Sequence, residues 1–363
     1  MKTEEMSIIE QLEQFRITTG SDIPPHEFLY TWNGIPCCAR GELVAVTGKA
    51  KSGKTYLNSI LMAAAGCPSE RMNGLMDEGM NGLMGEGHFL GLKRIREKPL
   101  RVVWIDTEQS ADSTHEILRD RIGAMIGTEA SDETYHVFNL RQVRWQDRLT
   151  LVLSAIAICM PDIVIFDGIR DVVGDINNYE EAQNTIGQLL KVASEYKTCV
   201  VCVLHQNKAA EDKTLRGALG TELQNKSFET YECKKDPETR IFSIQQTATR
   251  KYDMPNKIQF CVNKEGLPVG CEEVRGLEDE RVSGKEDVKD IFRAAMMGHS
   301  EMRAGALKAQ VMRRQNLRSD SIYGGLLVAA LQQGILLRRA VSDREVYYQP
   351  GPQLIEPQLD FGG

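Results

Sequence analysis

The sequence has 363 residues, of which 42% are hydrophobic and 26% are charged, a composition typical of folded protein and a length sufficient for two domains. Its formal net charge of −7 excludes a surface that is basic throughout, although it leaves room for a local basic patch. The acidic start, MKTEEMSIIEQLEQF, lacks the apolar centre of a signal peptide, and no apolar run reaches the roughly 18 residues of a membrane helix. We therefore expect a cytoplasmic protein that does not contact a membrane.

The nine cysteines do not form a metal or disulfide pattern. The single CxxC spacing, Cys199 to Cys202, lies inside TCVVCVLH, which has the composition of a buried strand. This favours core packing over redox chemistry.

The pattern along the chain predicts an α/β fold. Residues 4–15 have apolar side chains at helical spacing, and Pro24-Pro25 ends that segment. Short apolar runs then alternate with amphipathic stretches, which predicts a mostly parallel sheet with helices on both faces. After Lys226 the pattern changes to strands, which indicates an antiparallel extension. The predicted strands are 28–32, 42–47, 101–106, 135–140, 162–167 and 199–204, and the predicted helices include Asp112–Met125, Asp147–Met160 and Tyr179–Tyr196.

One segment departs from this alternation. MNGLMDEG at 72–79 is followed directly by MNGLMGEG at 80–87. Two copies are too few for a repeat fold. We interpret 67–98 as an insertion loop that tolerated a duplication, and a methionine-rich partner contact is the alternative.

The C-terminal part has a different character. Residues 272–286 are rich in charge and read as a linker. Three helical stretches (Asp287–Met297, Ala304–Met312 and Ser319–Gln333) and a hairpin follow, which is the order of a winged-helix domain over 287–350, before a tail at 351–363. Residues 301–344 hold eight lysines and arginines against three acids. Such local charge suits DNA phosphates, and docking of a protein partner is the alternative.

A phosphate-binding motif is complete near the N-terminus. GKAKSGKT fits G-x-x-x-x-G-K-[ST], with a predicted strand before it and a predicted helix after it. Backbone N–H groups of such a loop surround phosphates, the lysine reaches the outer phosphates, and the hydroxyl binds magnesium. ATP and Mg²⁺ are therefore the expected cofactors. The expected contacts are Gly48, Lys49, Ala50, Lys51, Ser52, Gly53, Lys54 and Thr55, with Tyr56 next to them.

Carboxylates follow two other predicted strands. Asp167 ends DIVIFD, where a second magnesium-binding carboxylate belongs, and an aspartate that only caps a loop is the alternative. Because Gly168 comes next, the catalytic base must lie elsewhere. Glu108, in WIDTEQS, is our first choice and Asp106 the second. At the end of the 199–204 strand, His205 or Gln206 is expected to sense the outer phosphate.

The ordered set GKAKSGKT, WIDTEQS, IFDGIRD, LHQNK and RGALGTE resembles the RecA-like ATPases, and among them the RepA-type hexameric helicases of plasmids and related ATPases of bacterial mobile elements. The resemblance covers roughly residues 28–265, within an expected ATPase domain at 28–271 that follows an N-terminal arm at 1–27. It implies a hexameric ring, with Glu108 as base and Gln206 as sensor. It also implies that Arg216, or Arg250 and Lys251, reach the ATP of the neighbouring subunit. The 67–98 insertion and the basic winged helix depart from the RepA pattern.

The resemblance implies a DNA motor in plasmid or mobile-element replication or transfer. Single-stranded DNA would meet Lys208 and Lys213 in the core, and duplex DNA the C-terminal arginines. A regulatory ATPase that uses ATP as an assembly switch, without unwinding, is the alternative. A small GTPase is unsupported because Ala210 stands where an aspartate would read guanine, and no ABC signature or kinase lid is visible. The C-terminal arginines in question are Arg313, Arg314, Arg318, Arg338 and Arg339.

Overall fold

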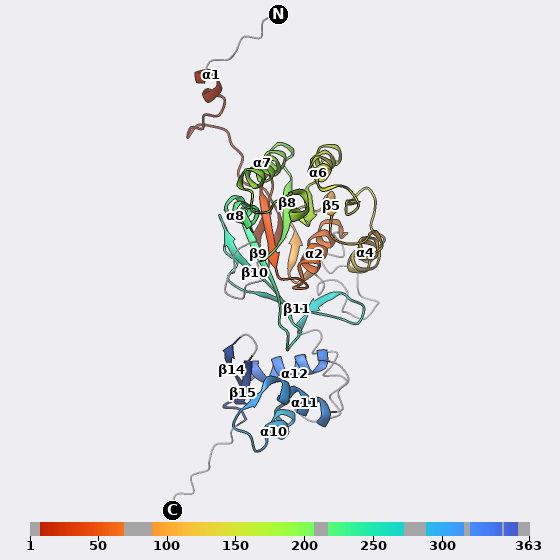
Figure 1. Ribbon diagram of the computed structural model, residues 1–363, viewed down its shortest axis with the longest axis vertical. Helices are drawn as coiled ribbons and strands as arrows, with labels where there is room; N and C mark the ends of the chain where they lie inside the picture. The colour runs from red at the N-terminus through yellow and green to blue at the C-terminus, as the bar shows by residue number, and fades with distance from the viewer. Residues whose placement is uncertain are drawn as a thin grey trace, which may run out of the picture.

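The computed structural model describes residues 8–68, 89–206, 217–271, 288–315, 320–342 and 345–354 (Figure 1). A short helix, α1 (Ile8–Glu13), precedes a large α/β unit, and a smaller unit of helices and strands ends the chain. Within the described ranges, no helix has the length and apolar character needed to cross a membrane.

The large unit is built on a nine-stranded sheet. Its strands are β3 (Leu43–Gly48), β5 (Val102–Asp106), β6 (Tyr135–Asn139), β7 (Ile163–Asp167), β8 (Cys199–His205), β9 (Glu229–Lys235), β10 (Phe242–Thr249), β11 (Ile258–Val262) and β12 (Pro268–Gly270). They lie in the order β12-β11-β10-β9-β3-β8-β7-β5-β6. The pairs from β9 to β6 are parallel and those from β9 to β12 are antiparallel. The predicted mostly parallel sheet with an antiparallel extension is confirmed.

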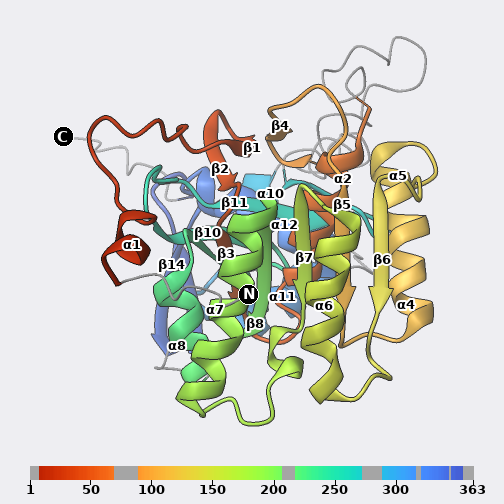
Figure 2. The same ribbon diagram turned by 90° about the horizontal axis from the view of Figure 1, so that it is seen from above.

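Helices cover both faces of this sheet (Figure 2). Strand β5 shows why: Val102 and Trp104 face one apolar core, while Val103 and Ile105 face the other. A strand buried on both sides needs apolar residues at every position, which is what its sequence provides. The first face carries α2 (Lys54–Gly66), α4 (Ala111–Glu116), the π-helical η2 (Ile117–Ile122) and α5 (Gly123–Ile126); the second carries α6 (Trp145–Cys159), the 3₁₀ turn η3 (Ile169–Val172), α7 (Tyr179–Tyr196) and α8 (Gly217–Lys226).

A second, three-stranded sheet lies beside the large one. It has the order β2-β1-β4, formed by β1 (Phe28–Trp32), β2 (Ile35–Ala39) and β4 (Leu92–Arg94). Asn33 and Gly34 join β1 to β2 with φ values of 49° and 83°, as a tight type I′ hairpin requires. The expected 67–98 insertion thus contributes a strand to this sheet, and Arg94 holds it in place by donating to the carbonyls of Ala65 (2.8 Å) and Cys67 (2.9 Å). The duplicated octapeptides lie outside the described residues.

The C-terminal unit has a core of its own, which includes Phe292, Leu307 and Leu327. Its helices and strands follow the predicted order, and its assignment as a winged helix stays a prediction. The elements are α10 (Val288–Met296), β13 (Met302–Arg303), α11 (Ala304–Arg314), α12 (Asp320–Gln332), β14 (Leu336–Ser342) and β15 (Glu345–Pro350), with the sheet order β13-β15-β14.

The turn between β9 and β10 meets the C-terminal unit (Figure 1). Tyr348 on β15 donates a hydrogen bond of 2.7 Å to Oε2 of Glu238 in that turn. On α12, a Cβ added to Gly324 would lie 2.3 Å from the carbonyl oxygen of Thr239. Both of these contacts lie at the tip of the β9–β10 hairpin.

Candidate active site

The phosphate loop follows β3 and leads into α2. Its glycines stand where no side chain fits. A Cβ on Gly48 would lie 2.4 Å from both the carbonyl oxygen of Cys233 and Oγ of Ser52, and one on Gly53, where φ is 102°, would lie 2.7 Å from the ring of Phe242. The loop is thus packed against β9 and β10, which fixes the backbone that would surround phosphates.

Lys54 is the first residue of α2 and is buried inside the loop. Its Nζ donates to the carbonyls of Gly48 (3.1 Å) and Lys49 (3.0 Å) and lies 3.0 Å from Nδ1 of His205. Burial lowers the pKa of Lys54. Among the described residues no carboxylate forms an ion pair with it, so the loop holds a desolvated cation whose contacts are two carbonyls and the ring of His205. Oγ of Ser52 is also buried without a hydrogen-bond partner in the described structure, which suits a loop made for phosphate oxygens.

Asp167 ends β7 at the same edge of the sheet, with β8 between it and the phosphate-loop strand. Nδ2 of Asn58 on α2 donates to its Oδ2 at 3.1 Å. Burial, and then the nearby carboxylates of Glu108 and Asp106, raise the pKa of Asp167 to about 7. A buried carboxylate surrounded by like charge is a good ligand for a cation. Thr55, one helical turn before Asn58, is half-buried. Thr55 and Asp167 together fit the expected magnesium site.

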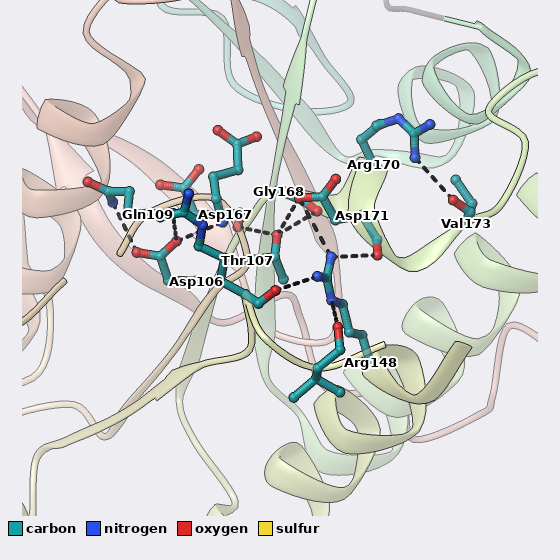
Figure 3. Close-up of polar contacts among 12 residues, drawn as sticks. Asp106, Thr107, Gln109, Arg148, Asp167, Gly168, Arg170, Asp171 and Val173 are labelled. Atoms are coloured by element: carbon teal, nitrogen blue, oxygen red, sulfur yellow. Dashed lines mark hydrogen bonds and ion pairs between the residues drawn. The ribbon is translucent and has the colours of Figure 1, made fainter. Parts of the chain in front are cut away.

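Gly168 could not be an acid in this fold. Its φ is 104°, and a Cβ there would lie 2.1 Å from Oγ1 of Thr107. That hydroxyl lies 3.1 Å from the carbonyl oxygens of Asp167 and Gly168 and from Oδ2 of Asp171 (Figure 3). Arg148 on α6 donates to the carbonyl of Asp171 at 3.1 Å, so the loop after β7 is held from two sides.

The two candidate bases after β5 differ in what surrounds them. Asp106 is fully buried, and its oxygens accept from the backbone N–H of Glu108, from the backbone and side chain of Gln109 (each 3.0 Å), and from Thr114 (2.7 Å). Asp106 therefore organises the turn after β5, and no lone pair of its carboxylate points to an open site. Glu108 is partly exposed, and its Oε2 lies 3.4 Å from Nε2 of His205. The hydrogen bond from His205 lowers the pKa of Glu108, so this carboxylate is ionised at neutral pH.

His205 and Gln206, which the sequence did not separate, are separated by the structure. His205 contacts both Lys54 and Glu108. Gln206 donates from Nε2 to Oε1 of Glu232 on β9 at 2.7 Å. Of the two, His205 is the one that the fold brings between the phosphate loop and the candidate base, while the sensor role that we expected for Gln206 stays a prediction.

The predicted donors to a neighbouring subunit lie elsewhere. Arg216 lies outside the described residues, as do Lys208 and Lys213. Arg250 donates to the carbonyls of Ser227 (3.2 Å) and Asn225 (3.0 Å), and its backbone N–H to Phe228, which itself bonds to Leu43 at the start of β3. Leu43 and Gly48, where the phosphate loop begins, are five residues apart along β3, a distance on the order of 17 Å. Nζ of Lys251 lies over the rings of Phe28 and Tyr252. Neither residue can therefore serve the phosphate loop of its own chain.

The candidate DNA-binding arginines of the C-terminal unit are exposed where the structure describes them. Arg313 and Arg314 end α11, and Arg338 and Arg339 lie on β14; Arg318 is outside the described residues. Arg339 forms a two-pronged ion pair with Glu301 at 2.7 and 2.8 Å. Its charge is thus partly matched within the unit.

Comparison with known proteins gives one family. Residues 21–211, more than half of the chain, match the AAA domain. A search for similar curated proteins finds no match. Among solved structures, the flagellar accessory protein FlaH from Methanocaldococcus jannaschii aligns with a TM-score of 0.40 and 14% identity over 63% of this chain and 89% of that one. The chain, with its complete phosphate loop and the carboxylates beside it, belongs to the AAA domain family of P-loop ATPases.

Proposed function

We propose that the chain is an ATP-driven motor of the RecA-like, RepA-helicase type that acts on DNA in plasmid or mobile-element replication or transfer. The observation that carries the hydrolytic part is the position of Glu108. It lies with Lys54 and Asp167 at one edge of the sheet, linked to Lys54 through His205. Asp106, the rival carboxylate, is committed to the turn.

In this proposal the backbone N–H groups of residues 48–55 bind the phosphates. The ammonium of Lys54 exchanges its contacts with the carbonyls of Gly48 and Lys49 for phosphate oxygens. Thr55 and Asp167 would hold Mg²⁺, whose positive charge would balance the phosphates. Oε2 of Glu108 accepts a proton from the attacking water. His205 orients Glu108 through its Nε2–H, the tautomer that its two partners imply.

The DNA part depends on the sequence resemblance and on the exposed arginines of the C-terminal unit. Single-stranded DNA would bind the core near Lys208 and Lys213, and duplex DNA the C-terminal unit, which we take as a winged helix. A hexameric ring would let Arg216 complete the neighbouring site. Arg250 is the weaker candidate, because its guanidinium is already bonded to two carbonyls of its own chain.

A regulatory ATPase is the second candidate. It is favoured by the contact of the C-terminal unit with the β9–β10 turn, because β9 and β10 also pack on the phosphate loop. In that case ATP would set the state of a DNA-binding unit without movement along a strand.

Unwinding of forked DNA with ATP and Mg²⁺ separates the two. The motor hypothesis expects strand separation by the wild-type protein and none by Lys54→Ala. DNA-stimulated ATP hydrolysis without strand separation would support the regulator instead. No hydrolysis with or without DNA would contradict both.

A further inference from the structure

The antiparallel end of the large sheet carries two thiols side by side. Cys261 lies on β11, and Cys271 directly follows β12, the strand at the edge of the sheet. The two residues are ten apart in the sequence, and the pairing of β11 with β12 brings their Sγ atoms to 3.4 Å from one another. All nine cysteines of the chain are thiols in the structure, so this pair is in its reduced form.

The position of the pair permits a bond between its sulfurs. A disulfide is about 2.05 Å long, so the two Sγ atoms would have to approach by about 1.4 Å. The last pair of the β11–β12 ladder joins Phe260 to Gly270, and Cys271 lies one residue beyond it. A small shift of Cys271 therefore brings the sulfurs together and leaves the strand pairs in place.

Solvent reaches the side of the sheet on which the pair lies. Cys261 and Cys271 are both partly exposed. Side chains alternate along β11, so Phe260 is buried in the apolar core, whereas Gln259, on the same side of the strand as Cys261, is exposed. A small oxidant dissolved in water can therefore reach these sulfurs.

A second group of neighbouring thiols in the same chain gives an internal comparison. Cys38 forms side-chain hydrogen bonds with Cys37 and Cys199, and all three residues are buried. The hydrogen bond with Cys38, and then burial, raise the pKa of Cys37 well above its ordinary value. Because the thiolate is the form that reacts, and because no oxidant reaches these side chains in the folded protein, this group should stay reduced.

We propose that Cys261 and Cys271 form a reversible dithiol–disulfide site whose oxidant is a small peroxide. One sulfur, as the thiolate, attacks an oxygen of hydrogen peroxide; the O–O bond breaks, hydroxide leaves and the sulfur becomes a sulfenic acid. The second thiolate attacks that sulfur, the S–O bond breaks, the S–S bond forms and a second hydroxide leaves. The two protons released by the thiols convert both hydroxides to water, so the pair loses the two electrons that the peroxide gains.

The bond would tie the edge strand to the rest of the sheet. Strand β12 has three residues, and β11 is its neighbour in the sheet. A short strand at an edge opens readily, because few contacts hold it. A covalent link at its end removes many of the open conformations, so oxidation should hold β12 on β11.

The first test treats the full-length wild-type protein with hydrogen peroxide and then blocks the remaining thiols with N-ethylmaleimide in denaturant. Cleavage by trypsin after lysine and arginine puts the two cysteines on separate peptides, 258–264 and 265–275. We expect these peptides to be joined, with the sum of their masses less two hydrogens, and to separate on reduction with dithiothreitol. In a mixture of isotopically light and heavy protein, the joined peptides should be light–light or heavy–heavy only.

Two cysteine variants give the controls for this test. Cys271→Ser should abolish the joined peptides, whereas Cys159→Ser, which removes another partly exposed thiol, should leave them unchanged. The peptides that contain Cys37, Cys38 and Cys199 should carry maleimide alone. Absence of the joined peptides from the wild type, or their presence in mixed light–heavy pairs, would overturn the proposal. Oxidation of the three buried thiols to the same extent would contradict it as well, because exposure would then not select the site.

The second test measures hydrogen exchange of the amides at 267–271. In the oxidised wild type these amides should exchange roughly tenfold more slowly or less than in the reduced protein. Peroxide should not change their exchange in Cys271→Ser. Equal exchange in oxidised and reduced wild type would show that the bond does not hold β12. Neither test uses nucleotide or DNA, so the outcome is independent of the proposed ATPase and motor activities.

Discussion

Nζ of Lys54 lies 3.0 Å from Nδ1 of His205, and the other nitrogen of the same ring reaches Glu108 at 3.4 Å. One imidazole ring thus lies between the phosphate-loop lysine and the candidate base, with one ring nitrogen toward each. In the proposed mechanism phosphates would draw Lys54 away and His205 would lose one of its two partners, so occupation of the phosphate loop would be linked to the orientation of Glu108.

The role of Glu108 is tested by Glu108→Gln. The amide keeps the shape of the side chain but cannot accept the proton of the attacking water, so turnover of ATP should fall about 100-fold or more. Nucleotide binding, measured by calorimetry, should change little. Glu116→Gln, at an exposed position on α4, is the matched control and should keep full activity. Equal turnover in wild type and Glu108→Gln would rule out this assignment.

The raised pKa of Asp167, about 7, predicts a pH dependence of stability in the absence of Mg²⁺. Between an unfolded-state pKa near 3.8 and the folded value, the folded protein holds a proton that the unfolded chain has released. This contribution is therefore complete below about pH 4 and is lost as pH rises to about 7, with an upper limit of about 4 kcal/mol. Between pH 5 and pH 8, the free energy of unfolding measured with denaturant should fall less for Asp167→Asn than for the wild type. An equal fall in the free energy of unfolding for the variant and the wild type would contradict the prediction.

The turn after β7 is tested by glycine substitutions. Gly168→Ala forces a Cβ into the left-handed region and against Thr107, so the free energy of unfolding should fall by at least about 1–3 kcal/mol. Gly187→Ala in the middle of α7 meets nothing within 4 Å and should instead stabilise by up to about 1 kcal/mol. Opposite signs in a denaturant titration are the expected result, and a neutral Gly168→Ala would exclude the strained geometry.

The apolar runs and the complete G-x-x-x-x-G-K-[ST] motif were enough to predict the parallel strands and the phosphate loop, because both are local patterns. The sequence could rank Glu108 above Asp106 but could not show that the Asp106 carboxylate accepts hydrogen bonds from Gln109 and Thr114, because those contacts depend on how the turn after β5 folds. The contacts of Cys233 and Phe242 with the loop depend on how β9 and β10 pair with β3. His205 and Gln206 are adjacent, and only the strand geometry decides which one faces Lys54.

The contact between the two units is tested by Tyr348→Phe. The change removes the hydrogen bond to Glu238 and leaves a carboxylate beside a buried ring, at a cost of about 1–3 kcal/mol. Tyr347→Phe is the control, because that hydroxyl bonds only to nearby Glu345 among the described residues. Faster limited proteolysis between the units is expected for Tyr348→Phe alone, and identical cleavage of both variants would show that the bond does not hold the units together.

The arginines of the C-terminal unit are not equivalent, and this gives a graded test of DNA binding. Each phosphate contact adds about 0.7 to 0.9 to the slope of log affinity against log salt. Arg338→Ala should reduce that slope by about one contact. Arg339→Ala should reduce it less, because its guanidinium is already paired with Glu301. Glu301→Gln should release Arg339 and steepen the slope, a gain that docking of a protein partner does not predict. If the three variants and the wild type bind duplex DNA with one common salt slope, these arginines do not contact phosphates, and the unit is better explained as a site for a protein partner.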